Sequence, residues 1–286
     1  MKKFGVLVAM LLTAALLFTG CAQQEGFDAS NAIATVSREE GSGTRGAFVE
    51  LMGLEDEEGN DLTDVNADIA GSTSVMMTNV AGNPYAIGYI SLGSLDATVK
   101  AIKVDGVAAT VDEILAGNYK VSRPFNIAVK QDSLSEVAQD FVDYILSTEG
   151  QAVIEKAGYI PLSDTKAYAG SKPSGEIRVS GSSSVSPVME KLIEAYEALN
   201  TNASIQLQET DSTSGMNDAI EGRSDIGMAS RELKQSETGS GLTGIVIATD
   251  GIAVIVNKEN PIEDLSSEQI KKIFMGQAAS WEEFEG

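Results

Sequence analysis

The sequence contains no histidine and only one cysteine among its 286 residues. Histidine is the commonest general base and the commonest metal ligand, so its absence removes Ser-His-Asp catalysis and most zinc sites. A single cysteine cannot form an internal disulfide. We therefore expect no catalytic residues, no metal and no cofactor.

Positive charge is also scarce. The chain has 20 Lys and Arg residues against 42 Asp and Glu residues, which gives a formal net charge of −22 at pH 7. Such a surface repels nucleic acid, so we expect no nucleic-acid partner. A buried anion site remains possible, because distant charges are screened beyond about 10 Å at ordinary salt.

Long apolar runs are absent except at the start of the chain, where residues 6–18 are nearly all apolar. This run is too short to cross a bilayer comfortably, and two lysines precede it, which is typical of a secretory signal peptide over residues 1–20. Cys21 directly follows a small residue and resembles the lipidation site of a bacterial lipoprotein. An ordinary signal with an unmodified cysteine is the alternative. Residues 21–30 have the composition of a short tether.

Short apolar runs and amphipathic stretches alternate along the rest of the chain. The runs predict strands over 32–36, 86–90, 125–129, 177–179, 205–207 and 252–256. The amphipathic stretches predict helices over 46–52, 137–146 and 186–199. This alternation favours an α/β fold with largely parallel sheets. Residues 163–175 have the composition of a linker.

Three turns rich in Ser, Thr and Gly each stand between a predicted strand and a predicted helix, at residues 37–44, 181–184 and 212–215. A helix N-terminus offers free N–H groups and a partial positive charge, and hydroxyls add further donors. Arg38 lies in the first turn, and its planar fork suits a tetrahedral oxyanion. The turns predict an oxyanion site. Any one such turn alone is usually only a helix cap, and an ion pair with Glu39 or Glu40 is the alternative for Arg38.

These segments resemble the high-affinity phosphate-binding proteins of bacterial ABC importers. Residues 36–45, Val-Ser-Arg-Glu-Glu-Gly-Ser-Gly-Thr-Arg, contain the signature Arg-x-x-Gly-Ser-Gly-Thr. Residues 179–187, 212–215 and 225–231 are similar to the family's first, second and third phosphate loops. The resemblance covers nearly the whole mature chain. It implies a two-lobed Venus-flytrap periplasmic-binding-protein fold, with mixed, mainly parallel sheets in each lobe.

The resemblance also implies the residues of a phosphate site. The guanidinium clamps the anion, while hydroxyls and backbone amides of the loops donate to it. These residues are Arg38, Ser42, Gly43, Thr44, Ser183, Ser184, Val185, Ser212, Ser230 and Arg231.

The third loop bears on which anion the site selects. The family often has an aspartate at Ser230, where a carboxylate accepts the phosphate proton and rejects sulfate. Ser230 can accept this proton but does not repel sulfate. We expect phosphate, with sulfate, molybdate and tungstate as alternatives. Arg231 either adds positive charge at the site or faces solvent.

The two halves of the chain stand in the reverse of the family's order, which resembles a circular permutation. Residues 31–162 match the later half and residues 176–286 the earlier half, so that 163–175 would bridge the old ends. We then expect one lobe from 31–122 plus 256–286, carrying the Arg-x-x-Gly-Ser-Gly-Thr loop, and another from 123–255, carrying the Ser-Ser-Ser loop. The chain would cross between lobes near 122–125 and 254–257, and residue 286 would lie near 27–32.

The resemblance implies an extracytoplasmic receptor, anchored to the cell membrane by lipid on Cys21, that delivers inorganic phosphate to the permease subunits of an ABC importer. We expect a monomer. A phosphate sensor or scavenger is the alternative within this fold. A hydrolase or phosphatase is disfavoured, because neither a Gly-x-Ser-x-Gly elbow nor a P-loop is present.

Overall fold

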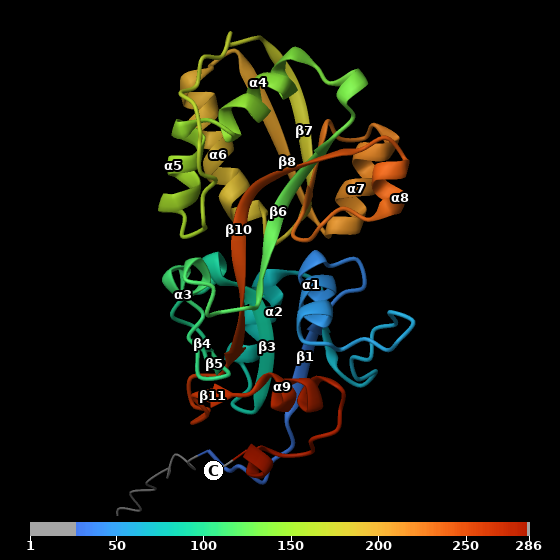
Figure 1. The fold of residues 1–286 in the computed structure, drawn as a ribbon, viewed down its shortest axis with the longest axis vertical. Coiled ribbons are helices and arrows are strands. Elements are labelled where there is room, and N and C mark those ends of the chain that lie inside the picture. The colour runs from blue at the N-terminus through green and yellow to red at the C-terminus, as the bar shows by residue number, and fades with distance from the viewer. Residues whose placement is uncertain (1–26, 285–286) are drawn as a thin grey trace, which may run out of the picture.

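The computed structural model describes residues 27–284, so the expected signal peptide, Cys21 and most of the tether lie outside the described residues. Two lobes are stacked along the long axis and joined by two long strands (Figure 1). We call them the lower lobe and the upper lobe, after their positions in that figure. The expected α/β fold with two lobes is confirmed.

The lower lobe is built on a mixed sheet. Strands β2 (Asp68–Ala70), β1 (Ala34–Arg38) and β3 (Ala86–Ser91) pair in parallel in this order, and the end of β10 (Thr243–Val256) pairs antiparallel to β3. Helices α1 (Gly43–Leu51), α2 (Thr73–Ala81), α3 (Val111–Leu115) and α9 (Ser267–Phe274) accompany it. Shorter elements are β4 (Lys100–Ala101), β5 (Lys103–Val104), β11 (Asp264–Leu265), η1 (Leu92–Ser94) and η3 (Trp281–Phe284).

Aromatic side chains fill the core of the lower lobe. The rings of Phe48 and Tyr89 stack with their centroids 4.0 Å apart, and Phe274 meets Phe48 edge-on at 4.9 Å. Each ring is fully buried, and burial of such a side chain stabilises the fold by about 1.5–3 kcal/mol. These contacts fix α1 against β3, which sets the position of the turn before α1.

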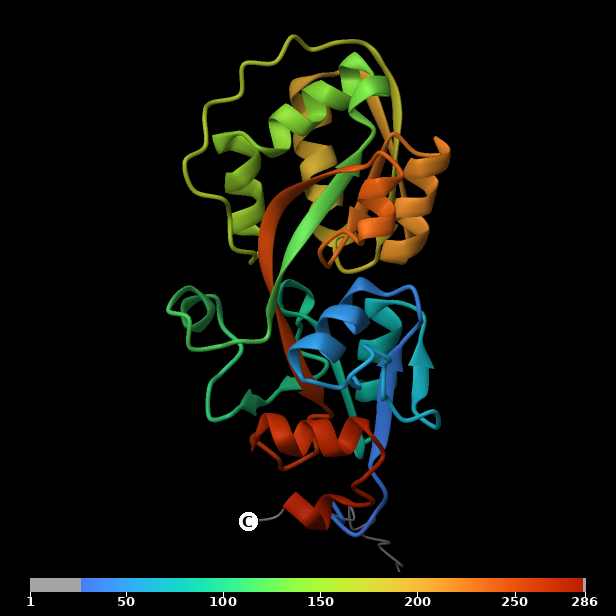
Figure 2. The ribbon, with the colours of Figure 1, turned by 45° about the vertical axis from the view of Figure 1, so that its right-hand side comes forward.

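The upper lobe repeats the design. Strands β8 (Ala203–Thr210), β7 (Gly175–Ser182) and β9 (Ile226–Ala229) pair in parallel, and β6 (Ser122–Val129) pairs antiparallel to both β9 and β10. Helices α4 (Glu136–Ile145), α5 (Thr148–Lys156) and α6 (Ser186–Leu199) cover one face, while α7 (Ser212–Glu221) and α8 (Gln235–Gly239) lie on the other (Figure 2). The short η2 (Gln131–Ser133) follows β6.

Strands β6 and β10 form the connection between the lobes. Ala248 packs in the core of the upper lobe, whereas Ile252 packs in the core of the lower lobe. The chain therefore crosses at Asp250, earlier than the expected crossing near 254–257. The reason is that Asp250 interrupts the apolar run and pairs across the ladder with buried Arg123 at 3.1 Å.

Both described ends of the chain lie together at the base of the lower lobe. Ala32 forms an antiparallel bridge with Ser280, and the Glu282 N–H donates to the Ala29 carbonyl at 3.0 Å. The rings of Phe27 and Trp281 meet edge-on at 6.4 Å. The expected proximity of the two ends is therefore found as far as residue 284, and residue 286 itself lies outside the described residues.

Residues 163–175 run over the surface of the upper lobe (Figure 2). The buried carboxylate of Asp140 holds them, because it accepts hydrogen bonds from Tyr168 Oη at 2.6 Å and from the Ser171 N–H at 3.0 Å. Tyr196 Oη donates to the same carboxylate at 2.8 Å. The linker is thus an ordered strap fixed to α4 and α6.

Candidate functional site

Arg38 lies at the end of β1, where its side chain is buried at the boundary between the lobes. Its Nε and Nη2 atoms donate to the two carboxylate oxygens of Glu39 at 2.7 and 2.6 Å. Nη2 also donates to Ser183 Oγ at 3.0 Å, and Nη1 donates to Thr73 Oγ1 at 3.4 Å. One edge of the guanidinium is therefore held by Glu39, while the other edge faces hydroxyl groups from both lobes.

These hydroxyl groups form a buried cluster across the lobe boundary. Thr44 Oγ1 of the lower lobe lies 2.7 Å from Ser184 Oγ of the upper lobe, and Thr73 Oγ1 lies 3.1 Å from the same atom. Ser182 Oγ donates to Ser230 Oγ at 3.0 Å. We call this group the hydroxyl cluster. Its members, each 4% exposed or less, are Thr44, Thr73, Ser182, Ser183, Ser184, Ser212 and Ser230.

Four helices begin at the hydroxyl cluster, namely α1, α2, α6 and α7. Within residues 27–284, the N–H groups of Gly43 and Thr44 at the start of α1 have no hydrogen-bond acceptor. Gly43 also allows a close approach between lobes, because a Cβ there would lie 2.4 Å from Ser212 Oγ. Free amides and the positive ends of several helix dipoles favour a negatively charged ligand at this place.

Tyr89 supports Arg38 from below. Its hydroxyl lies 2.9 Å from Ser37 Oγ and accepts a hydrogen bond from the Arg38 N–H at 3.3 Å. Burial raises the pKa of Tyr89 to about 12, so the phenol stays neutral at ordinary pH. This contact fixes the end of β1 without adding negative charge beside the guanidinium.

The structure brings most of the predicted site residues together. Arg38, Thr44, Ser183, Ser184, Ser212 and Ser230 contact one another directly or through one neighbour, and Gly43 packs against them. Ser42 stands beside them as the N-cap of α1, where its Oγ accepts from the Arg45 N–H at 3.3 Å. The Val185 amide is engaged within its own turn, because it donates to the Ser182 carbonyl at 3.0 Å.

Arg231 lies outside the hydroxyl cluster and is 9% exposed, so it neither joins the cluster nor faces solvent freely. Its Nη1 and Nη2 atoms donate to the carboxylate of Glu237 at 2.9 and 2.7 Å. Nη2 also donates to Thr213 Oγ1 at 3.3 Å. The guanidinium therefore supports the start of α7 from beside the cluster.

Thr73 and Ser182 belong to the cluster but are absent from the predicted set. Ser182 lies in the predicted turn 181–184, so the same motif contained the signal. Thr73 begins α2 directly after Gly71 and Ser72, which form a fourth small-residue turn between a strand and a helix. The pattern of a small-residue turn between a strand and a helix would have predicted this turn too, if the short strand β2 before it had been recognised.

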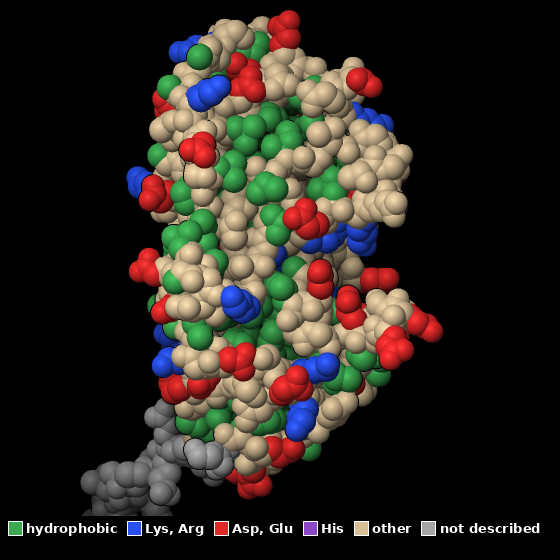
Figure 3. Space-filling view, viewed as in Figure 1, with side chains coloured by type: hydrophobic (Ala, Val, Ile, Leu, Met, Phe, Trp, Pro, Cys, Tyr) green, Lys and Arg blue, Asp and Glu red, His purple; other side chains and the backbone are tan. Residues whose placement is uncertain are grey.

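The face of the molecule shown in Figure 3 carries charged side chains of both signs. Acidic side chains spread over both lobes on the face shown in Figure 3, and a group of Lys and Arg side chains stands at the right where the lobes meet. Of the described residues 27–284, no group of three or more His, Cys, Asp or Glu side chains could hold a metal ion, and no helix is long and apolar enough to cross a membrane.

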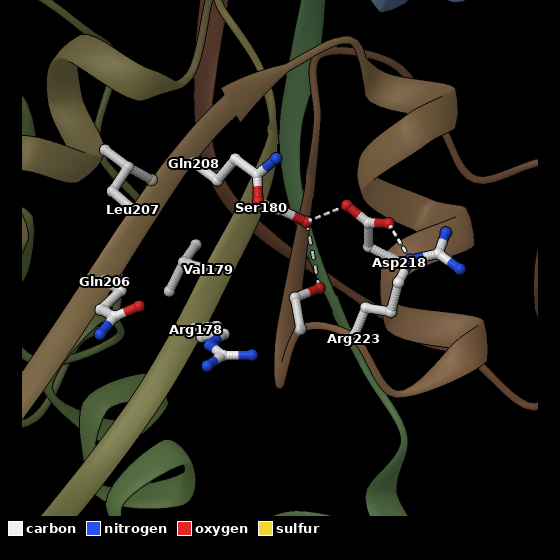
Figure 4. Close-up of a pocket in the computed structure, with 9 residues that line it drawn as sticks. Arg178, Val179, Ser180, Gln206, Leu207, Gln208, Asp218 and Arg223 are labelled. Atoms are coloured by element: carbon white, nitrogen blue, oxygen red, sulfur yellow. Dashed lines mark hydrogen bonds and ion pairs between the residues drawn. The ribbon is translucent and has the colours of Figure 1, made fainter.

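A separate pocket of about 440 Å³ lies against β7 and β8 of the upper lobe (Figure 4). Some of its polar groups bond to one another, since Ser180 Oγ donates to Asp218 at 3.0 Å and Arg223 Nε donates to Asp218 at 2.7 Å. None of the hydroxyl-cluster residues lines it. This pocket is therefore distinct from the candidate site.

Known proteins resemble this chain along most of its length. The PBP superfamily domain matches residues 18–149 and 166–286. Phosphate-binding protein PstS 2 of Streptococcus agalactiae is 50% identical over 288 residues, which covers 98% of each chain. Phosphate-binding protein PstS 2 of Streptococcus pneumoniae is 43% identical and covers 89% of this chain and 88% of its own.

A solved structure agrees with these relatives. The crystal structure of the phosphate-binding protein of a phosphate ABC transporter from Streptococcus pneumoniae superposes with a TM-score of 0.70 at 42% identity, covering 89% of this chain and all of that one. The S. agalactiae alignment spans both chains almost end to end, so that relative shares the order of segments found here. The chain belongs to the PBP superfamily and, within it, to the PstS family of phosphate-binding proteins.

Proposed function

We propose that this protein binds inorganic phosphate outside the cytoplasm and delivers it to an ABC importer. The observation that carries the proposal is the edge of the Arg38 guanidinium that points away from Glu39 and donates to hydroxyls supplied by both lobes. The PstS relatives, which are named phosphate-binding proteins, support the same ligand. Binding between two lobes allows hinge closure around the anion.

The chemistry of the site suits a tetrahedral oxyanion. Arg38 supplies a fixed positive charge, and the hydroxyl cluster supplies donors arranged around it. Each hydrogen bond to a charged group contributes about 1.5–3 kcal/mol net. Several such bonds, less the cost of ordering the groups, correspond to micromolar affinity or better, since 1 μM equals about −8 kcal/mol.

We assign phosphate contacts to Arg38, to the amides of Gly43 and Thr44, and to the hydroxyl cluster, including Thr73 and Ser182. Ser42 and Val185 hold the turns from which these groups donate. Arg231 acts through Thr213 and Glu237 beside the site. Because hydroxyls both donate and accept, Ser230 and its neighbours can accept the proton of hydrogen phosphate, which sulfate lacks.

We assign ligand binding rather than catalysis, because the similar proteins are binding proteins and the sequence has no histidine to act as a general base. We further propose a lipid anchor on Cys21, contact with permease subunits and a monomeric state. The order of the two halves is best explained as a circular permutation. The strap at 163–175 would join the two ends of an unpermuted chain, and the bridge between Ala32 and Ser280 shows that the described ends of the present chain lie together.

Calorimetric titration of the chain beginning at residue 22 tests the function. Phosphate should bind with a Kd at or below the micromolar range, and sulfate should bind far more weakly. Arg38→Ala should abolish phosphate binding, whereas Arg178→Ala, an exposed arginine on β7, should leave it unchanged. Preference for sulfate, molybdate or tungstate would keep the fold and replace the ligand. Binding of none of these anions would refute the proposal.

A further inference from the structure

The turn before α1 touches the upper lobe at a second place, outside the hydroxyl cluster. The Gly41 carbonyl in this turn accepts hydrogen bonds from the Thr213 N–H and from Thr213 Oγ1, both at 3.2 Å. Thr213 lies in the first turn of α7, so these bonds join the lower lobe to the upper lobe. Arg231 donates to the same hydroxyl at 3.3 Å and holds it in place.

Gly41 also lies directly under the residue that caps α7. A Cβ atom at position 41 would lie 2.0 Å from Asp211 Oδ1, 2.4 Å from its Cγ and 3.0 Å from its Oδ2. Real Cβ atoms do not approach other atoms so closely, so the two groups could not both keep their places. The φ angle of Gly41 is not in the left-handed region, and the requirement for glycine therefore comes from the other lobe.

Asp211 cannot move aside without losing bonds of its own. Its Oδ1 accepts from the Ser214 N–H at 2.9 Å, and its Oδ2 accepts from Ser214 Oγ at 2.5 Å. These bonds cap α7, whose next residue, Ser212, belongs to the hydroxyl cluster. A side chain at position 41 would therefore either disturb the start of α7 or keep the two lobes apart.

We propose that Gly41 is a positioning residue for lobe closure, whose lack of a side chain lets α7 seat on the lower lobe. This inference rests on the proposed phosphate binding, because closure brings the upper-lobe hydroxyls to Arg38. A substituent at position 41 lowers the population of the closed state without touching the ligand. The apparent affinity falls by the same factor as that population.

The test compares Gly41→Ala with Gly239→Ala by calorimetric titration with inorganic phosphate. A Cβ at Gly239, an exposed residue at the end of α8, would meet nothing within 4 Å, so this matched variant should bind as the unmodified protein does. Gly41→Ala should weaken phosphate binding at least tenfold. Its melting temperature without phosphate should stay within a few degrees of the parent, which separates lost closure from lost folding.

A double variant identifies the cause. Asp211→Gly removes the atoms that collide with the new Cβ, and glycine is a tolerable N-cap. Gly41→Ala with Asp211→Gly should therefore recover most of the lost affinity, whereas Asp211→Gly alone should bind within about threefold of the parent. Failure of the double variant to recover, or a Gly41→Ala protein that binds normally, would overturn the inference.

Small-angle scattering gives a readout that does not depend on affinity. With saturating phosphate the parent should be more compact than Gly41→Ala, and the double variant should match the parent. If the parent binds no phosphate, the proposed function fails. A comparison of the compactness of Gly41→Ala with that of the parent then still decides whether Gly41 positions the two lobes. If Gly41→Ala does not fold, Thr213→Val, which removes the hydroxyl that donates to Gly41 and accepts from Arg231, should weaken binding severalfold, and unchanged binding would contradict the proposal.

Discussion

The hydroxyl oxygens of Thr44 and Ser184 lie 2.7 Å apart although the two residues belong to different lobes. Thr44 is carried by the first turn of α1, and Ser184 by the turn between β7 and α6. Neither oxygen has access to solvent, since both residues are 1% exposed. The groups that we assign to phosphate are therefore among the groups through which the lobes meet.

Thr44→Val tests this double role, because valine keeps the shape of threonine and removes the hydroxyl. Loss of one hydrogen bond to a charged ligand costs about 1.5–3 kcal/mol, so phosphate affinity should fall by about 10- to 150-fold. Thr44→Ser should retain most of the affinity. Thr78→Val, at a hydroxyl of α2 that bonds only to the Ser74 carbonyl, serves as the control. Unaltered titration of Thr44→Val would remove Thr44 from the site.

Asp250 should make stability depend on pH. Burial raises the pKa of Asp250 to about 6, partly opposed by the charge of Arg123 and by a hydrogen bond from the Gly93 N–H. A raised pKa means that the folded state holds the proton more tightly than the unfolded state. The contribution of this group is therefore full below about pH 4 and is lost as the pH rises through about 6.

Urea unfolding of the parent and of Asp250→Asn, measured from pH 4 to 8, checks this direction. Asparagine resembles the protonated acid and does not titrate. The free energy of unfolding of the parent, relative to the variant, should decrease between pH 4 and 6 and then level off. Arg123, Tyr119 and Tyr159 face position 250 in both proteins, so the difference reports the titration of Asp250 together with its charge interactions with these groups. A flat difference across this range would show that Asp250 titrates normally.

The strap at 163–175 should depend on Asp140. Asp140→Ala leaves the hydroxyls of Tyr168 and Tyr196 and the Ser171 N–H without their acceptor. We expect the free energy of unfolding to fall by about 2–4 kcal/mol. Asp143→Ala, on the exposed side of the same helix, should change it by about 0.5 kcal/mol or less. Chemical denaturation followed by circular dichroism measures both, and equal effects would contradict the strap's role.

Trp281 should be a principal support of the lower lobe. It is fully buried between Phe27 and Phe284, and its Nε1 donates to the Tyr85 carbonyl at 3.1 Å. Trp281→Ala should destabilise the protein by about 3–5 kcal/mol. The exposed Leu115 provides a control, since Leu115→Ala should have little effect. A Trp281→Ala protein as stable as its parent would place the end of the chain outside the core.

The sequence predicted the α/β class and the main turns, because both depend on local signals. The turn after β1 combines an arginine with glycines, a serine and a threonine, and α1 follows it with Ala47 and Phe48 buried as their spacing predicts. The start of α6 at Ser186 was placed correctly. Its N-cap, Val185, makes no side-chain cap bond, and the Ser186 hydroxyl donates to the Ser182 carbonyl within the same turn.

Other features could not be predicted because they depend on partners far away in the chain. Strand β2 has only three residues, two of them exposed, so neither β2 nor Thr73 behind it stood out. The hinge position depends on Asp250 pairing with Arg123, which are 127 residues apart. The position of Arg231 could not be predicted, because it depends on hydrogen bonds to Glu237 and Thr213.

The meeting of the two ends at Ala32 and Ser280 has a consequence for chains that are cut short. The upper lobe draws its core from Phe125 to Ala248, whereas the lower lobe needs Val36 and Phe48 together with Val256, Phe274 and Trp281. A chain ending before Trp281 would still contain every upper-lobe hydroxyl but would lack a sound support for Arg38. Ligand binding therefore requires the last segment of the chain, and truncated copies would not compete for the ligand.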